Sequence, residues 1–122
     1  MSGSLGGANR DFDDGAEVNA AELSLLHSPV VAEQVLDGAP TSGAVALGEY
    51  AGSEVGVWEL TPGTVTDVEA DELFVVLSGA ATVEFVDEER LVHLGPGSVM
   101  RLEAGQRTVW TVTETLRKVY LT

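Results

Sequence analysis

From residue 30 onward, apolar and polar positions alternate in short runs that are rich in β-branched and aromatic residues. Among these runs are GAVALGEY, VGVWELT, LFVVL, ATVEFV and RTVWTV. Clusters such as TPG, SG, DEE and GPG separate the runs, which recur about every eight to twelve residues. Alternation with a period of two predicts strands, and Gly, Pro and Asp between the runs predict turns. The pattern therefore predicts an all-β sandwich or barrel.

Two of the runs indicate which side chains face the interior. In Glu72–Leu77 both alternating faces are apolar beyond Glu72, which is typical of a strand that is covered on both sides. A filled barrel and, on the other side, an outer sheet or partner subunit would provide that cover. In the run 107–112, Thr108 and Trp110 share one face and Arg107 takes the other. We expect Thr108 and Trp110 to project into the barrel.

The first 28 residues have a different character from the rest. Residues 1–20 are rich in Gly, Asp, Asn and Ser, so we expect a loosely docked lead-in that ends at residue 28. Within it, residues 17–26 could form one short helix, because Asn19 and Glu22 have the spacing of a capping box. Residues 29–122 form the predicted barrel domain.

The composition excludes several classes of protein. The chain has 122 residues, no cysteine and a formal net charge of −14. This length suits one domain with a sizeable core, and the lack of cysteine excludes disulfides and thiolate chemistry. The acidic balance argues against binding to nucleic acid or to an anionic membrane. No apolar run is long enough to span a bilayer, and the N-terminus lacks the apolar core of a secretion signal, so we expect a cytoplasmic protein.

The charge is unevenly distributed along the chain. Residues 91–122 hold two acids and four bases, which are Arg101, Arg107, Arg117 and Lys118. These cations could pair with acids elsewhere in the fold, or they could meet an anionic ligand. Arg101 could clamp a carboxylate or phosphate if it turns inward, whereas the alternation places Arg107 outside.

Several motifs occur in a fixed order along the chain. They are GVWELTPG at 56–63, Asp71 and Glu72 followed by VVLSG, then LGPGS at 94–98 and TVWTVTETLRKVYLT at 108–122. In this order they resemble the cupin superfamily (RmlC-like), and more closely its small single-barrel branch, related to ureidoglycine aminohydrolase and the ethanolamine-utilisation cupins. The resemblance implies a double-stranded β-helix, or jelly-roll barrel. It also implies a homodimer, in which Val30–Leu36 is the exchanged or docked strand.

The metal site of such cupins is built from two motifs, which this sequence matches at few positions. Glu72 and Gly79 match the carboxylate ligand and the glycine of the first motif. The His-x-His pair of that motif falls on Thr66–Val68 or, one residue earlier, on Val65–Asp67. The resemblance thus leaves Glu72 as the one matched ligand.

The remaining residue types agree with this shortage of ligands. The histidine of the second motif falls on Thr108, and the chain has two histidines, His27 and His93. A site of three histidines is therefore impossible within one chain. An all-oxygen site for a hard cation stays open in the acidic run 67–72, although alternating acids are also typical of a solvated strand. We expect no metal and no cofactor, with a divalent cation at Glu72 as the open alternative.

We expect a small polar metabolite to bind inside the barrel, without a metal ion. The predicted site residues are Thr66, Glu72, Phe74, Arg101, Thr108 and Trp110. A different function stays open, that of a small-molecule enzyme resembling ureidoglycine aminohydrolase, with Glu72 as catalytic base or metal ligand. A third possibility is a barrel filled by its own side chains, with a structural or regulatory role.

Overall fold

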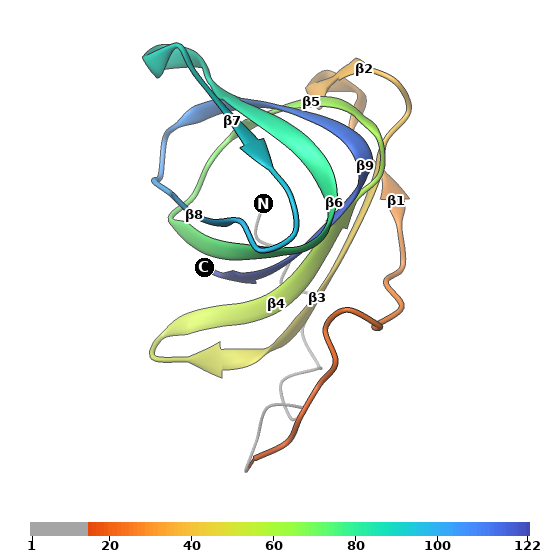
Figure 1. The fold of residues 1–122 in the computed structure, drawn as a ribbon, viewed down its shortest axis with the longest axis vertical. Helices are drawn as coiled ribbons and strands as arrows, with labels where there is room; N and C mark the ends of the chain where they lie inside the picture. Colours follow the sequence, from red (N-terminus) through yellow and green to blue (C-terminus); the bar gives the residue numbers. More distant parts are fainter. Residues whose placement is uncertain (1–14) are drawn as a thin grey trace.

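The computed structural model describes residues 15–122, which form one curled antiparallel sheet (Figure 1). Its strands are β1 Ser28–Pro29, β2 Val35–Asp37, β3 Thr41–Tyr50, β4 Ser53–Leu60, β5 Gly63–Val68, β6 Glu72–Phe85, β7 Arg90–Leu94, β8 Val99–Leu102 and β9 Arg107–Leu121. The prediction of an all-β fold is confirmed. Within the described part of the chain, the helices are two 3₁₀ turns, Ala32–Gln34 and Val86–Glu88, and no helix is long and apolar enough to cross a membrane.

Strand β9 is the element around which the sheet curls. Its first half pairs with β5, and its second half pairs with β4. Strand β6 pairs with both halves of β9 and also with β7 and β8. Two long strands that each bend between neighbours close the sheet around one interior, as the rings of Figure 1 show. The interior is therefore lined by alternate residues of β4, β5, β6 and β9.

Alternation along β9 fills that interior with large side chains. The even-numbered positions Thr108, Trp110, Val112, Leu116 and Tyr120 are all buried. Trp110 packs edge-on against Trp58 of β4 and at a tilt against Phe74 of β6, with ring centroids 6.3 and 5.9 Å apart. The aromatic cluster occupies the middle of the core.

Strand β6 changes its inward-facing set of residues part of the way along. The buried positions are even-numbered from Glu72 to Val76 and odd-numbered from Ala81 to Phe85. Irregular pairing with β9 lies between these two parts, around Gly79, which has a φ of 97°. A Cβ at Gly79 would overlap the carbonyl oxygen of Thr115 and lie 2.7 Å from the Cα of Leu116. Glycine is required here both by the backbone angle and by the closeness of β9.

The predicted helix over residues 17–26 is wrong. The structure has a single turn there, in which the backbone N–H of Glu22 donates to the carbonyl of Asn19 at 3.1 Å. The Asn19 side chain accepts from the N–H of Ala21 and donates to the Glu22 carboxylate, so the two residues do contact each other, but not through the pair of backbone hydrogen bonds that defines a capping box. A segment this short gains too little from helical hydrogen bonds to nucleate a helix. The rest of the predicted lead-in, residues 1–14, lies outside the described residues.

The segment Val30–Leu36 is docked on its own barrel and is not one continuous strand. A 3₁₀ turn at Ala32–Gln34 interrupts it, and only its end continues into β2. Strand β2 pairs with β5 of the same chain, where Val35 lies opposite Val65. The edge of the sheet at β5 is thereby covered.

Replacing Gly79 by Ala separates the cost of the clash at this position from the cost of its backbone angle. Gly97 has a similar φ of 91°, but nothing lies within 4 Å of a Cβ built there. We expect Gly97→Ala to lower the free energy of unfolding by about 1 kcal/mol and Gly79→Ala by about 2–5 kcal/mol. Urea unfolding of both variants checks this. Equal losses would mean that β9 yields to the added methyl group.

Candidate functional site

A cavity of about 400 Å³ opens at the mouth of the barrel. It lies between β3, β4, β5 and β9 and the segment that leads into β1. Its lining residues are Leu26, Ser28, Val30, Gln34, Ser42, Gly43, Ala44, Trp58, Leu60, Val65, Thr66, Asp67 and Trp110. Apolar walls with a few polar groups among them are typical of a small-molecule site.

The chemistry of this cavity is set by two tryptophans and one acid. Trp58 and Trp110, the only tryptophans of the chain, both line it. Asp67 is the one charged residue among the lining residues, and none of those residues is Lys, Arg or His. The cavity therefore combines the edges of two largely buried tryptophans with a negative charge, and serine, threonine and glutamine are its further polar groups.

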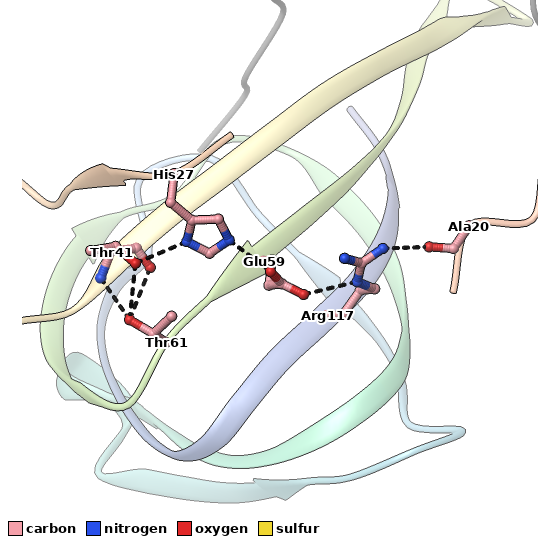
Figure 2. A network of polar contacts seen from close by, with 6 residues as sticks. All are labelled: Ala20, His27, Thr41, Glu59, Thr61 and Arg117. Atoms are coloured by element: carbon pink, nitrogen blue, oxygen red, sulfur yellow. Dashed lines mark hydrogen bonds and ion pairs between the residues drawn. The ribbon is translucent and has the colours of Figure 1, made fainter. Parts of the chain in front are cut away.

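A polar network on the outside of the barrel holds one wall of the cavity in place (Figure 2). The carboxylate of Glu59 contacts the His27 ring at 2.7 Å and accepts from Arg117 Nε at 2.9 Å. His27 also contacts the Thr41 hydroxyl at 2.9 Å, and Arg117 donates to the Ala20 carbonyl at 2.8 Å. These contacts fix residues 20–27, and the next residues along the chain form the cavity wall.

Glu59 is ionised at the centre of this network. Partial burial acts to raise the pKa of Glu59, but the hydrogen bonds from His27 and Arg117 outweigh it and the pKa is lowered. A carboxylate that accepts from two cationic or polar donors is a firm anchor for the segment before β1.

Beneath the tryptophans, a lysine is completely buried. Lys118 Nζ lies 2.6 Å from Oε2 of Glu72, which is itself almost completely buried. The same nitrogen lies over the rings of Trp58, Phe74 and Trp110, at 4.5, 4.3 and 5.1 Å from their centroids. One carboxylate and three aromatic faces thus surround the ammonium.

Burial lowers the pKa of Lys118, because the charged form loses its water. The charge and hydrogen bond of Glu72 act in the opposite direction, and Glu69 and Asp67 add weaker attraction. The ion pair occupies the carboxylate that the cupin resemblance offers as a metal ligand or base.

A second acid, Glu69, is buried next to the cavity. Its Oε2 accepts from the Thr108 hydroxyl at 2.6 Å and from Trp110 Nε1 at 3.0 Å. Its Oε1 has no hydrogen-bond partner among the described residues. Burial raises the pKa of Glu69, and the nearby charge of Asp67 adds to the rise. The carboxyl therefore favours its protonated form more strongly than a solvent-exposed acid does.

The structure brings four of the predicted site residues together in the interior, where Glu72, Phe74 and Trp110 surround Lys118 and the Thr108 hydroxyl lies 3.1 Å from Trp110 Nε1. Glu72, Phe74, Thr108 and Trp110 are all buried on the inner faces of β6 and β9. Of these, Trp110 reaches the cavity, whereas Glu72 and Phe74 lie behind it in contact with the lysine.

The two other predicted site residues lie elsewhere. Thr66 borders the cavity, but its hydroxyl lies 3.5 Å from the Gln34 carbonyl, because Val65 and Asp67 take the inward positions of β5 opposite Trp110 and Thr108. Arg101 is exposed on the outside of β8, since its neighbour Leu102 faces the core.

The cations of the last segment mostly pair with acids, as the first of the two interpretations has it. Arg107 pairs with Asp87 on the surface, while Arg117 and Lys118 pair with Glu59 and Glu72. Arg101 makes no ion pair within residues 15–122. Arg101, which could clamp an anion only by turning inward, points outward instead.

The positions that hold the metal in the resembled family do not fit a metal ion in this chain. The inward pair is Val65 and Asp67, the second-motif position is Thr108, and Glu72 is bound by Lys118. Throughout the described part of the chain, no group of three His, Cys, Asp or Glu could hold a metal ion. Val65 offers no donor atom, and the Thr108 hydroxyl is used by Glu69.

Two important residues, Lys118 and Glu69, were not predicted from the sequence. The alternation that places Thr108 and Trp110 inside extends by parity to Lys118, and this would have identified it. No comparable signal exists for Glu69, which follows the end of β5 and resembles a solvated acid in a turn.

Residues 47–120 match the family model of the EutQ-like cupin domain. No curated protein sequence matches the chain. Among solved structures, the EutQ protein of Clostridium difficile is similar, with a TM-score of 0.67 and 16% identity over 87% of this chain and 84% of that protein.

Two further similar structures are of proteins with unknown function. One, from Pseudomonas syringae and assigned to the DUF861 family, has a TM-score of 0.71 and 21% identity, covering 82% of this chain and 44% of that one. The other, from Rhizobium leguminosarum, has a TM-score of 0.60 and 21% identity, covering 66% and 79%. Likeness at these identities shows the predicted cupin jelly roll and nothing about the ligand.

Replacing Glu69 by Gln tests the state of the buried carboxyl. The fold raises the pKa of Glu69 above its ordinary value of 4.5. Above that ordinary value the folded state binds more protons than the unfolded state, so this group makes stability fall as pH rises towards the raised value. Glutamine keeps an acceptor for Thr108 and Trp110 and carries no charge. We expect the difference in melting temperature between Glu69→Gln and wild type to shift in favour of the variant as the pH rises from about 4 to about 7.

Glu103→Gln is the matched control, because Glu103 is exposed. Its melting temperature should follow that of wild type across the same pH range. If Glu69→Gln behaves in the same way, the carboxyl of Glu69 titrates as an ordinary acid.

Proposed function

Because the chain belongs to the EutQ-like cupin domain family, we propose that it binds a small polar metabolite in the mouth of its barrel, without a metal ion. The observation that carries this proposal is the cavity of about 400 Å³ whose floor is formed by Trp58 and Trp110. Its volume suits a molecule of metabolite size, and its polar groups could orient one. Among the described residues, no group of three His, Cys, Asp or Glu side chains could hold a metal ion there.

The charge of the lining indicates which metabolites suit the cavity. Asp67 is its only charged residue, and neighbouring Glu69 adds a further carboxyl. An anionic ligand would meet repulsion there and would find no Lys, Arg or His among the lining residues. We therefore propose a neutral or cationic ligand that donates hydrogen bonds, such as an amine, amidine or amide, and that stacks on a tryptophan.

The enzymatic alternative has less support from the geometry. It requires the Glu72 carboxylate to be free to accept a proton or to bind a metal ion. Lys118 Nζ lies 2.6 Å from that carboxylate, and three aromatic rings enclose the pair. We therefore advance the binding function, with Glu72 as a structural counterion and not as a base.

A second copy of the chain is the macromolecular partner that we propose. Leu73, Val75 and Val99 are 44%, 37% and 64% exposed on the outer face of β6 and β8, where Val75 lies opposite Val99. This is the side of the run Glu72–Leu77 that the chain itself leaves uncovered. Adjacent exposed apolar side chains on a sheet are typical of an interface. The cytoplasmic location stays a prediction from the sequence.

The proposed ligand class can be tested with three probes of one shape. Benzamidine is cationic, benzamide is neutral and benzoate is anionic. Since both tryptophans line the cavity, intrinsic tryptophan fluorescence reports on it directly. We expect saturable changes with benzamidine and benzamide, and an affinity for benzamidine about tenfold or more above that for benzoate. Tighter binding of benzoate would overturn the proposed charge preference.

Two variants assign the binding to this cavity. Asp67→Asn removes the lining charge and should bring benzamidine down to the affinity of benzamide. Ala44→Phe should fill the mouth and abolish the response to every probe, since Ala44 lines the cavity on β3. A response that survives in Ala44→Phe would place the binding elsewhere.

The proposed dimer is tested by placing a charge on the exposed apolar face. We expect wild type to sediment as a dimer and Val99→Asp to sediment as a monomer, because burying an unpaired carboxylate in an interface is costly. Val68→Asp is the matched control, since Val68 is also 64% exposed but lies on β5. A monomeric wild type, or equal effects of the two variants, would contradict this interface.

A further inference from the structure

The interior of the barrel contains the elements of a cation-binding site. A carboxylate, Glu72, lies 2.6 Å from the buried nitrogen of Lys118, and three aromatic rings present their faces to it within 5.1 Å. Aromatic faces with one anion are the surroundings in which proteins bind alkylammonium groups. Here the alkylammonium group is part of the chain itself.

We propose that the alkylammonium group of Lys118 is the resident cation of this barrel and pairs with the Glu72 carboxylate in place of a metal ion. This inference concerns other charged groups than the metabolite proposal, because Lys118 and Glu72 are not among the residues that line the cavity, although Trp58 and Trp110 take part in both. It assigns a cation site to a part of the molecule in which Glu72 is the one family metal ligand that remains.

The positions of the two metal motifs support this assignment. Glu72, the one family ligand that this chain retains, is the residue that binds Lys118. Asp67, which takes an inward position of the His-x-His pair, also attracts the lysine charge. Glu69 attracts it more strongly than Asp67 does and less strongly than Glu72 does, and Glu69 Oε1 is buried without a hydrogen-bond partner among the described residues. Glu72 is thus the one acid in contact with the lysine nitrogen, while Glu69 and Asp67 act on its charge from a greater distance.

A divalent ion and the ammonium could not share this site. An ion bound to Glu72 would lie within a few ångströms of a positive charge, in surroundings from which water is excluded. Because the ammonium group is covalently attached to the chain, its placement here does not cost the translational freedom that a free ion loses on binding. The lysine therefore excludes the metal ion as well as replacing it.

The chain is well suited to a test of this inference, because Lys118 is its only lysine. Lys118→Ala removes three methylene groups and the ammonium, which together correspond to n-propylammonium. We expect this variant to melt at a lower temperature than wild type. Added n-propylammonium should restore the melting temperature saturably, by about 5 °C at ten times its dissociation constant. n-Propanol, which lacks the charge, should have much less effect.

Two further variants establish that the rescue arises at this site. Lys118→Met fills the space with an uncharged chain and should not respond to n-propylammonium. Adding Glu72→Gln to Lys118→Ala removes the counterion and should abolish the rescue. If Lys118→Met responds as strongly as Lys118→Ala, or if Lys118→Ala folds and does not respond, the inference is overturned.

A measurement on the wild-type protein decides the matter even if Lys118→Ala does not fold. Calorimetric titration with Mn²⁺ and with Zn²⁺ should show no one-to-one binding that depends on Glu72. Stoichiometric binding that Glu72→Gln abolishes would overturn the inference, because the carboxylate would then belong to a metal site. The fluorescence of Trp58 and Trp110 with the benzamidine series tests the cavity separately, so failure of either proposal is distinguishable from failure of the other.

Discussion

The charge of Lys118 lies where water cannot reach it, and the arrangement of the interior follows from that constraint. A buried ammonium is costly unless a nearby anion and polarisable surfaces replace its water. Glu72 provides the anion from the first residue of β6, and rings from β4, β6 and β9 provide the surfaces. The long strands β6 and β9 must therefore stay in register along the whole barrel. A slip of one residue would turn either partner of the ion pair outward.

Two neighbouring residues of β9, Arg117 and Lys118, place their positively charged side chains on opposite faces of the sheet. Arg117 lies opposite Glu59 and Lys118 lies opposite Trp58, in adjacent positions of the pairing between β4 and β9. The outer pair holds residues 20–27 against the barrel, and the inner pair stabilises its centre. One short stretch of β9 thus joins the cavity wall to the core, so the shape of the mouth depends on the same strand that positions the lysine.

Sequence patterns were sufficient for the strands and for the buried place of Glu72, because alternation and turn residues are local properties. The short helix was wrong since the capping residues Asn19 and Glu22 form their contacts within a single turn. The cation in the core was missed for a different reason: alternation along β9 points Lys118 inward, but lysine is almost always exposed, and its partner Glu72 comes from a distant strand. Burial of Glu69 likewise depends on Thr108 and Trp110, about forty residues further along the chain.

The solitary buried lysine also determines how this protein responds to amine chemistry. Acylating reagents and lysine-directed crosslinkers react with exposed, unprotonated amines, and the folded barrel presents no lysine side chain to them. Enzymes that acetylate or ubiquitinate lysine would likewise find the side chain of Lys118 out of reach while the barrel is folded. The rate at which Lys118 reacts with such a reagent therefore reports how often the barrel opens, and no label needs to be added.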